Sequence, residues 1–233
     1  MDRALIERAA EACGVTLTAS MIDRVIRYID MLQAANQTTN LTAITDPEAI
    51  ATKHLEDSWR LVRHVPPKAS LIDVGTGAGF PGLALKIVRP DLDVTLIDAT
   101  NKKVRFLRSV TEALCLECVR ALHARAEELS RTSEHRDRYD IAVARAVTRL
   151  PILAELCLPL VRPGGMMIAM KGIDDETRDA ARAVRLLGGR TARVEAYELT
   201  GDEGRRSLVF IDKRTATPKR FPRRMATISK KPL

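Results

Sequence analysis

Apolar side chains recur every three or four positions in the first seventy residues, which predicts helices in this part of the chain. The clearest apolar stripe consists of Ile22, Val25, Ile29 and Leu32, with charged residues between them. Asp46 followed by Pro47 indicates the start of a further helix, because Asp is a good N-cap and proline suits the first helical position. We therefore expect an N-terminal helical extension that packs on the rest of the protein.

From residue 70 onward, short apolar runs alternate with amphipathic stretches. The predicted strands are 71–74, 94–97, 119–122, 141–144 and 166–170, and the intervening and following helices are predicted to end near 88, 116, 160 and 187. Strands that alternate with helices indicate a parallel sheet that helices cover on both faces.

The last two predicted strands break this alternation. Residues 194–199 and 208–211 are separated by a segment too short for a crossover helix, so they should form an antiparallel hairpin. We predict an α/β fold with a seven-stranded, mostly parallel sheet. Its parts are the N-terminal helical extension at 1–69, the α/β domain at 70–212 and a basic C-terminal segment at 213–233.

A glycine-rich stretch follows the first predicted strand. Its glycines are Gly75, Gly77, Gly79 and Gly82. A loop of this kind between a strand and a helix brings backbone N–H groups close to a ligand. The spacing also satisfies the dinucleotide-binding fingerprint, so a nicotinamide or flavin enzyme is one alternative. A tight turn without any ligand is another.

Three features favour S-adenosylmethionine as the ligand. Asp73 lies inside the first strand, where a carboxylate suits a ligand with a cationic end. Asp98 ends the second strand and could accept hydrogen bonds from both ribose hydroxyls, although it could also simply cap the next helix. The terminal hairpin is unusual for nicotinamide-binding sheets. We therefore predict a class I (Rossmann-like) S-adenosylmethionine-dependent methyltransferase fold.

The net charge of +8 is concentrated at the C-terminus. Residues 213–233 contain eight basic residues and no acidic one, and residues 1–212 are neutral overall. We expect this segment to bind a polyanion, with a merely solubilising terminus as the alternative. The predicted RNA-binding residues are Lys219, Arg220, Arg223, Arg224, Lys230 and Lys231. Aromatic residues make up only 3% of the chain, which disfavours base stacking along a single strand.

The remaining composition indicates a cytoplasmic protein. The first ten residues carry charges where a signal peptide would need an apolar stretch, and no run is long enough to span a membrane. Cys115 and Cys118 form a CxxC pair with no second ligand pair, so we expect no metal and place both thiols between a helix and a strand.

Several motifs together resemble the RsmG (GidB) family over nearly the whole chain. They are residues 73–82, 40–44 (NLTAI), 54–58 (HLEDS), 102–107 (KKVRFL), 144–146 (ARA), 221–223 (FPR) and 230–233 (KKPL). Members of this family methylate N7 of one guanine, guanine 527 of 16S ribosomal RNA, with S-adenosylmethionine as donor. The resemblance implies the same activity here, with 16S ribosomal RNA in the small subunit as partner.

The resemblance also implies which residues contact the cofactor. They are Gly75 and Phe80 at the loop, Ala126 and Glu127 after the third strand, and Arg145 after the fourth. Together with Asp73, Gly77, Gly79 and Asp98 from the loop and the second strand, these form the predicted cofactor site. Two departures lie in the C-terminal segment, where Ala226 and Ile228 stand in place of the glycine and proline typical of the family.

The chemistry of guanine N7 requires no general base, because this atom already carries an in-plane lone pair. Catalysis would depend on orientation, for which Arg145 and Lys171 are candidates at the ends of the fourth and fifth strands. A surface position for Lys171 is equally open. Asn40 and His54 could line the acceptor site, but a histidine hydrogen-bonded to Asp57 is the favoured interpretation of His54.

Two other functions stay open at this point. One is a non-catalytic RNA-binding factor of ribosome assembly, and the other is a methyltransferase for small molecules. The intact glycine loop and Asp98 argue against the first, and the basic segment argues against the second. We expect a monomer without membrane contact.

Overall fold

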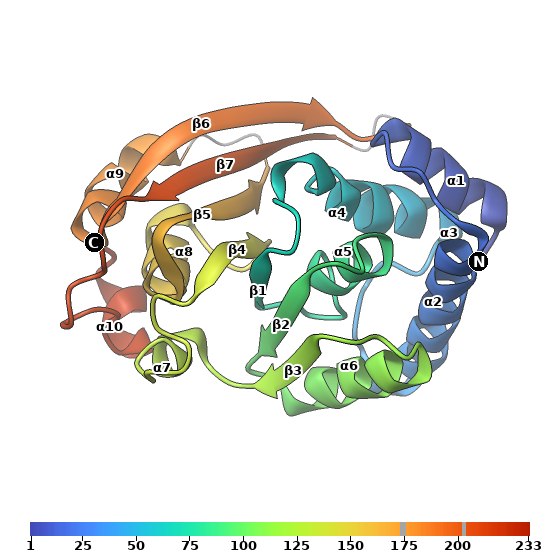
Figure 1. The fold of residues 1–233 in the computed structure, drawn as a ribbon, viewed down its shortest axis with the longest axis horizontal. Coiled ribbons are helices and arrows are strands. Elements are labelled where there is room, and N and C mark those ends of the chain that lie inside the picture. Colours follow the sequence, from blue (N-terminus) through green and yellow to red (C-terminus); the bar gives the residue numbers. More distant parts are fainter. Residues whose placement is uncertain (173–175, 202–203) are drawn as a thin grey trace.

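The computed structural model describes residues 1–172, 176–201 and 204–233. A seven-stranded sheet runs through the molecule in the order β3-β2-β1-β4-β5-β7-β6 (Figure 1). The strands are β1 Ser70–Val74, β2 Asp93–Asp98, β3 Val119–His123, β4 Tyr139–Arg145, β5 Val161–Lys171, β6 Gly189–Glu198 and β7 Arg205–Lys213. Strands β1 to β5 are parallel, and β7 pairs antiparallel with both β5 and β6. The predicted mostly parallel sheet and its terminal hairpin are confirmed.

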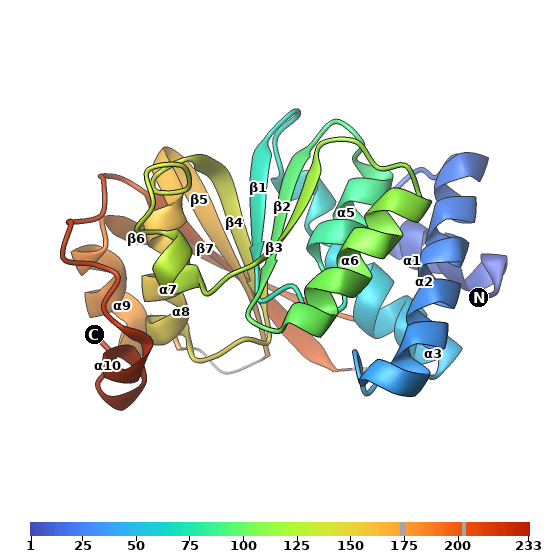
Figure 2. The ribbon, with the colours of Figure 1, turned by 90° about the horizontal axis from the view of Figure 1, so that it is seen from below.

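Helices cover both faces of this sheet (Figure 2). The α-helices are α1 Arg3–Ala12, α2 Ala19–Thr39, α3 Pro47–Ile50, α4 Asp57–Trp59, α5 Gly82–Val88, α6 Asn101–Ala113, α7 Ala126–Leu129, α8 Leu150–Cys157, α9 Thr177–Leu186 and α10 Met225–Lys230. One face carries α5 and α6 with the N-terminal helices outside them, and the other carries α7, α8, α9 and α10. Within the described ranges, no helix combines the length and apolar character needed to cross a bilayer.

The helix predicted to begin at Pro47 is capped as expected but is not regular. The Asp46 side chain accepts a hydrogen bond from the Ala49 N–H at 2.9 Å. After α3 the chain widens into a π-helical segment, η1 Ala51–Glu56, before α4 continues in the same direction. Short π-helical insertions of this kind are frequent at functional sites.

Two strands begin five residues before their apolar runs. β5 begins at Val161 and β6 at Gly189, whereas their apolar runs begin at 166 and 194. The early half of β6 is polar because it forms the edge of the sheet, with only β7 beside it. An edge strand buries little side-chain surface, so its sequence lacks the apolar run that signals a buried strand.

The N-terminal helices share one hydrophobic core with the sheet. Tyr28 of α2 is fully buried, and its hydroxyl donates to the Ala78 carbonyl in the glycine loop at 2.6 Å. The indole N–H of Trp59 donates to the Ala84 carbonyl of α5 at 3.1 Å. A second hydrophobic cluster lies on the other face, among α8, α9 and the sheet. The extension therefore packs as part of the same domain, and Tyr28 holds the glycine loop through its hydrogen bond to Ala78.

The basic segment 213–233 is packed against the domain. The Lys213 side chain is fully buried and donates to the Leu158 carbonyl, and Phe221 and Ile228 are buried in the second cluster. The Arg223 guanidinium forms a two-point ion pair with the buried Glu155 carboxylate of α8, with N···O distances of 2.9 and 2.6 Å. The positive charges of this segment thus occupy a defined surface.

Loss of the Arg223 side chain should destabilise the whole domain. Arg223→Ala would leave the Glu155 carboxylate buried without its counter-ion, which we expect to lower the free energy of unfolding by about 3 kcal/mol. Urea denaturation measures the effect. Arg224→Ala removes the exposed neighbouring charge and should change stability by less than about 0.5 kcal/mol. Equal stabilities of the two variants would contradict a structural role for the Arg223 ion pair.

Candidate functional site

The glycine loop lies where β1 ends, beside the end of β2. The N–H groups of Gly75 and Thr76 donate to the Ile97 carbonyl at 2.9 and 3.1 Å, which ties the loop to the neighbouring strand. Gly77 adopts a φ of +62°, and a side chain added there would meet no atom within 4 Å. The loop backbone is therefore open to a ligand at Gly77, in a conformation that favours glycine.

Asp98 at the end of β2 faces this loop. Its carboxylate accepts hydrogen bonds from the Gly77 N–H at 3.1 Å and the Thr100 N–H at 2.8 Å. The second contact stabilises the turn into α6, so the side chain also acts as a local cap. Each carboxylate oxygen keeps a further lone pair, which leaves Asp98 able to accept hydrogen bonds from a bound hydroxyl group.

Asp73 is buried beneath the loop with unused hydrogen-bonding capacity. One oxygen accepts from the Gly82 N–H at 2.8 Å. The other oxygen and the Thr76 hydroxyl are buried without a partner among the described residues. Burial raises the pKa of Asp73 to about 6, and the nearby Thr76 hydroxyl and the Gly82 N–H oppose this rise. An orphaned carboxylate oxygen under an open loop fits a ligand that carries a positive charge or several donors.

Ala126 and Glu127 lie at the start of α7, which follows β3. The Ala124 N–H donates to the Asp98 carbonyl at 3.2 Å, so the end of β3 is held beside the end of β2. Both Ala126 and Glu127 are buried. The structure thus places these two residues, Asp98 and the glycine loop along the carboxyl ends of three adjacent strands.

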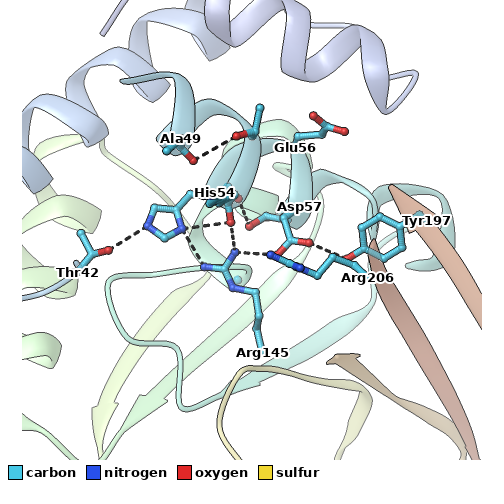
Figure 3. A network of polar contacts seen from close by, with 12 residues as sticks. Thr42, Ala49, His54, Glu56, Asp57, Arg145, Tyr197 and Arg206 are labelled. Carbon is cyan, nitrogen blue, oxygen red and sulfur yellow. Dashed lines mark hydrogen bonds and ion pairs between the residues drawn. The ribbon is translucent and has the colours of Figure 1, made fainter. Parts of the chain in front are cut away.

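A separate cavity of about 400 Å³ opens at the carboxyl ends of β4 and β5. It is lined by Ile44, Lys53, His54, Asp57, Arg145, Ala146, Met170, Lys171, Gly172, Tyr197 and Arg206. These residues come from the N-terminal extension, the strand ends and the terminal hairpin. Figure 3 shows the polar network along its wall.

Arg145 is the centre of this network. One terminal nitrogen donates to the Lys53 carbonyl at 2.7 Å and to the Asp57 carboxylate at 3.0 Å (Figure 3). The other contacts His54 Nδ1 at 3.2 Å. The guanidinium carbon also lies 5.5 Å from the centre of the Phe80 ring. Because Phe80 belongs to the glycine loop, Arg145 connects that loop to the cavity wall.

His54 contacts Arg145 and Thr42, and the hydrogen bond to Asp57 that we favoured from the sequence is wrong. Its Nε2 lies 3.1 Å from the Thr42 hydroxyl, and its ring stacks on Phe80 at a centroid distance of 4.3 Å. Nδ1 contacts both a group that can only donate, the Arg145 guanidinium at 3.2 Å, and a group that can only accept, the Lys53 carbonyl at 3.3 Å. Burial, with Arg145 adding to it, lowers the pKa of His54 to about 3, so the ring is neutral.

Lys171 and Asn40 have different places. The Lys171 ammonium lines the cavity, donates to the Thr148 carbonyl at 3.0 Å and pairs with Glu176 at 2.8 Å. Asn40 is an exposed residue that ends α2 with a φ of +47° and does not line the cavity. Lys171 is therefore an ion-paired residue of the cavity wall, and Asn40 lies outside the cavity.

The cavity also contains residues that the sequence reasoning missed. Asp57 was considered only as a partner for His54, whereas its carboxylate bridges Arg145 and the Tyr197 hydroxyl, which donates at 2.6 Å. Tyr197 and Arg206 are register partners in the terminal hairpin. Nothing in their local sequence signals a site, because the hairpin reaches the cavity only through the antiparallel insertion of β7.

Comparison with known proteins identifies the family. Residues 21–207 match the GidB family, described as rRNA small subunit methyltransferase G. The chain belongs to this family. The ribosomal RNA small subunit methyltransferase G of Moorella thermoacetica is 44% identical, with 98% of this chain and 97% of that protein covered. The protein of the same name from Staphylococcus carnosus is 42% identical over 98% of this chain and 97% of its own.

Solved structures share the fold at low sequence identity. A SAM-dependent methyltransferase from Aquifex aeolicus matches with a TM-score of 0.55 and 16% identity, over 74% of this chain and 97% of that one. A SAM-dependent O-methyltransferase from Thermotoga maritima also gives 0.55 and 16%, over 82% and 72%. The family resemblance and the class I methyltransferase fold predicted from the sequence are thereby confirmed.

The predicted RNA-binding residues lie before, on and directly after α10. Lys219, Arg220, Arg224, Lys230 and Lys231 are exposed. Arg223 instead pairs with Glu155, and its role in RNA binding stays a prediction. Ile228, one of the two departures from the family pattern, is buried under α10 and anchors that helix. In Figure 2, α10 lies in the lower half of the view, as do the carboxyl ends of the parallel strands, and at the opposite end of the molecule from α3.

The neutral state of His54 should appear as a loss of stability in acid. Its pKa rises from about 3 in the folded protein to the ordinary 6.5 on unfolding, so the unfolded chain binds the extra proton between these values. Stability therefore falls as the pH drops below 6.5. From pH 7 to pH 5, we expect this residue to reduce the free energy of unfolding by about 2 kcal/mol.

The measurement compares the wild type with His54→Asn by urea denaturation at both pH values. Asp73 works in the opposite direction over this range, because its folded pKa is raised. Its contribution is common to both proteins and cancels in the comparison. His123→Asn, at an exposed histidine, is the control and should keep the wild-type pH dependence. An unchanged pH dependence in His54→Asn would refute a neutral buried ring.

Proposed function

We propose that this protein transfers a methyl group from S-adenosylmethionine to N7 of a guanine in 16S ribosomal RNA of the small ribosomal subunit. Membership of the GidB family supports the reaction class and the RNA. The observation that carries the proposal is a shared wall between two sites. Phe80 belongs to the glycine loop, and its ring packs against His54 and Arg145 of the separate cavity. A methyl donor bound at the loop and a methyl acceptor bound in the cavity would therefore lie next to each other.

The loop side has the groups that S-adenosylmethionine requires. When bound, this cofactor supplies an electrophilic methyl group on a sulfonium. Asp98 would accept hydrogen bonds from the ribose, with Ala126 and Glu127 beside the adenosine. The open backbone from Gly75 to Gly79 and the unpaired oxygen of Asp73 would hold the methionyl end.

The cavity side has the properties of an acceptor site. His54 is too weakly basic to act as a general base, because burial and Arg145 lower its pKa to about 3 and both ring nitrogens already have partners. Guanine N7 does not need one, since its lone pair is available for attack. Arg145 and Lys171 would orient the guanine O6 or an adjacent phosphate through hydrogen bonds. Catalysis would then rest on proximity and alignment.

The shape of RNA places a condition on the target. N7 lies on the major-groove edge, and the major groove of an A-form helix is too deep and narrow for side chains. The guanine would therefore enter the cavity from a loop or after extrusion from its stack. A cavity of about 400 Å³ is within the usual range for small-molecule sites.

The cellular setting follows from the same proposal. We place the protein in the cytoplasm as a monomer, with the basic surface around α10 against the RNA. All four cysteines are free, which agrees with a reducing compartment. Cys115 and Cys118 are exposed between α6 and β3.

The cofactor site is tested by Asp98→Asn. Removing the charge weakens hydrogen bonds to the ribose, and we expect the Kd for S-adenosylmethionine to rise about tenfold or more. Isothermal titration measures it. Asp93→Asn, at the other end of β2, breaks a surface ion pair with Arg120 and should leave the Kd unchanged. Equal affinities for both variants would remove Asp98 from the site.

The reaction itself is tested on ribosomal RNA. Small subunits that lack the modification should gain one methyl group from labelled S-adenosylmethionine, and chemical cleavage at N7-methylguanine should map it to guanine 527. Methylation of a free nucleoside instead would indicate a small-molecule enzyme. Tight binding of the subunit without methyl transfer would indicate an assembly factor. Either outcome would overturn the proposed reaction.

The basic surface should govern the salt dependence of RNA binding. In the triple variant Arg220→Gln, Arg224→Gln, Lys230→Gln, the slope of log K against log salt should become shallower by about 0.7–0.9 for each RNA phosphate that the variant no longer neutralises. Affinity for S-adenosylmethionine should not change. The control is a second triple variant that removes three exposed positive charges from α1 and α2: Arg3→Gln, Arg8→Gln, Arg27→Gln. A slope that falls equally in both variants would show that only total charge matters.

A further inference from the structure

Tyr197 lies in β6 near the tip of the terminal hairpin, far in sequence from the other polar residues of the acceptor cavity. Its hydroxyl donates to one oxygen of the Asp57 carboxylate at 2.6 Å (Figure 3). Burial and the neighbouring Asp57 raise the pKa of Tyr197 well above its ordinary value, so the hydroxyl keeps its proton. Tyr197 is thus a fixed donor to Asp57.

Asp57 is the only carboxylate among the described residues that line the cavity. The cationic residues of the lining are Lys53, Arg145, Lys171 and Arg206. Asp57 is 4% exposed, and its second oxygen accepts from Arg145 at 3.0 Å. Because the other charged groups of the cavity wall are cations, the Asp57 carboxylate is the charged partner that holds Arg145 in place.

The π-helical segment η1 completes the support of Arg145. Its wider turn leaves the Lys53 carbonyl directed at the guanidinium, which donates to it at 2.7 Å. The Lys53 carbonyl and His54 are neutral acceptors, so the orientation of Arg145 depends most on Asp57. A guanidinium has five N–H donors. The Nε–H and one N–H of Nη2 have no hydrogen-bond acceptor in the described part of the chain.

We propose that Tyr197 is a positioning residue for the methyl acceptor. It orients the Asp57 carboxylate, which fixes Arg145 so that the two remaining N–H groups meet the guanine or its phosphate. The inference rests on the proposed function, because it assigns the cavity to the RNA nucleotide. It also explains why the hairpin contributes to the site, because the Tyr197 hydroxyl of the hairpin donates to the Asp57 carboxylate of the N-terminal extension.

Tyr197→Phe tests this role, since it removes one hydroxyl and keeps the ring. We expect kcat/KM for the ribosomal RNA substrate to fall about tenfold, the loss typical of a hydrogen bond to a charged group. The Kd for S-adenosylmethionine should change less than about twofold, because Asp98 and the glycine loop are untouched. Tyr139→Phe is the matched control. It removes another buried hydroxyl, which contacts His135 Nδ1 at 2.6 Å and Thr95 at 3.3 Å away from the cavity, and should leave kcat/KM unchanged.

A double-mutant cycle separates positioning from general stabilisation. If Tyr197 acts through Asp57, the variant Asp57→Asn, Tyr197→Phe should be no worse than Asp57→Asn alone. Where Asp57→Asn does not fold, the cycle is made with Arg145→Lys, which removes the planar fork that Asp57 holds. Losses in kcat/KM that add fully would overturn the inference.

The wild type distinguishes failure of the inference from failure of the function. A wild type that binds S-adenosylmethionine and methylates the RNA, together with an equally active Tyr197→Phe, refutes the role of Tyr197 alone. A wild type that does not methylate any ribosomal RNA refutes the proposed function and the inference with it. A parallel fall of kcat/KM in Tyr197→Phe and Tyr139→Phe would reveal a structural effect only.

Discussion

The arrangement of the site depends on one guanidinium that must be neutralised and directed. Arg145 ends β4 at the sheet edge where the strand ends meet, and Asp57, Lys53 and His54 supply its acceptors. All three acceptors come from the N-terminal extension, which the sequence does not connect to β4 in any visible way. A half-buried cation without such partners would be costly, so the extension supports this strand end.

The sheet order places the remaining walls. β1 and β4 are neighbours, so the glycine loop after β1 and Arg145 after β4 lie on the same edge. The antiparallel β7 starts at that edge beside Lys171, as the register of Lys171 with Ser207 shows. The hairpin tip therefore closes one side of the cavity, where it contacts the N-terminal extension through Tyr197 and Asp57. The glycine loop and the cavity, our proposed donor and acceptor sites, are adjacent because of strand order.

Patterns that depend on local chemistry were predicted well from the sequence. The parallel strands, the glycine loop and the Asp46 cap each have a short-range signature, and all are present. The partner of His54 was predicted wrongly, because spacing along a regular helix placed it near Asp57, whereas η1 is π-helical. Tyr197 carries no signature, since its role arises from contacts 140 residues apart in sequence. Long-range contacts of this kind are decided by tertiary packing.

The ion pair between Arg223 and Glu155 has a consequence for encounter with a large partner. A disordered cationic terminus would lose conformational entropy each time it bound a nucleic acid. Here that ordering has already occurred during folding, because Phe221, Ile228 and the ion pair hold the segment against α8. If this segment contacts RNA as we propose, less conformational entropy would be lost on binding, and the shape of the segment as well as its charge would select the docking site.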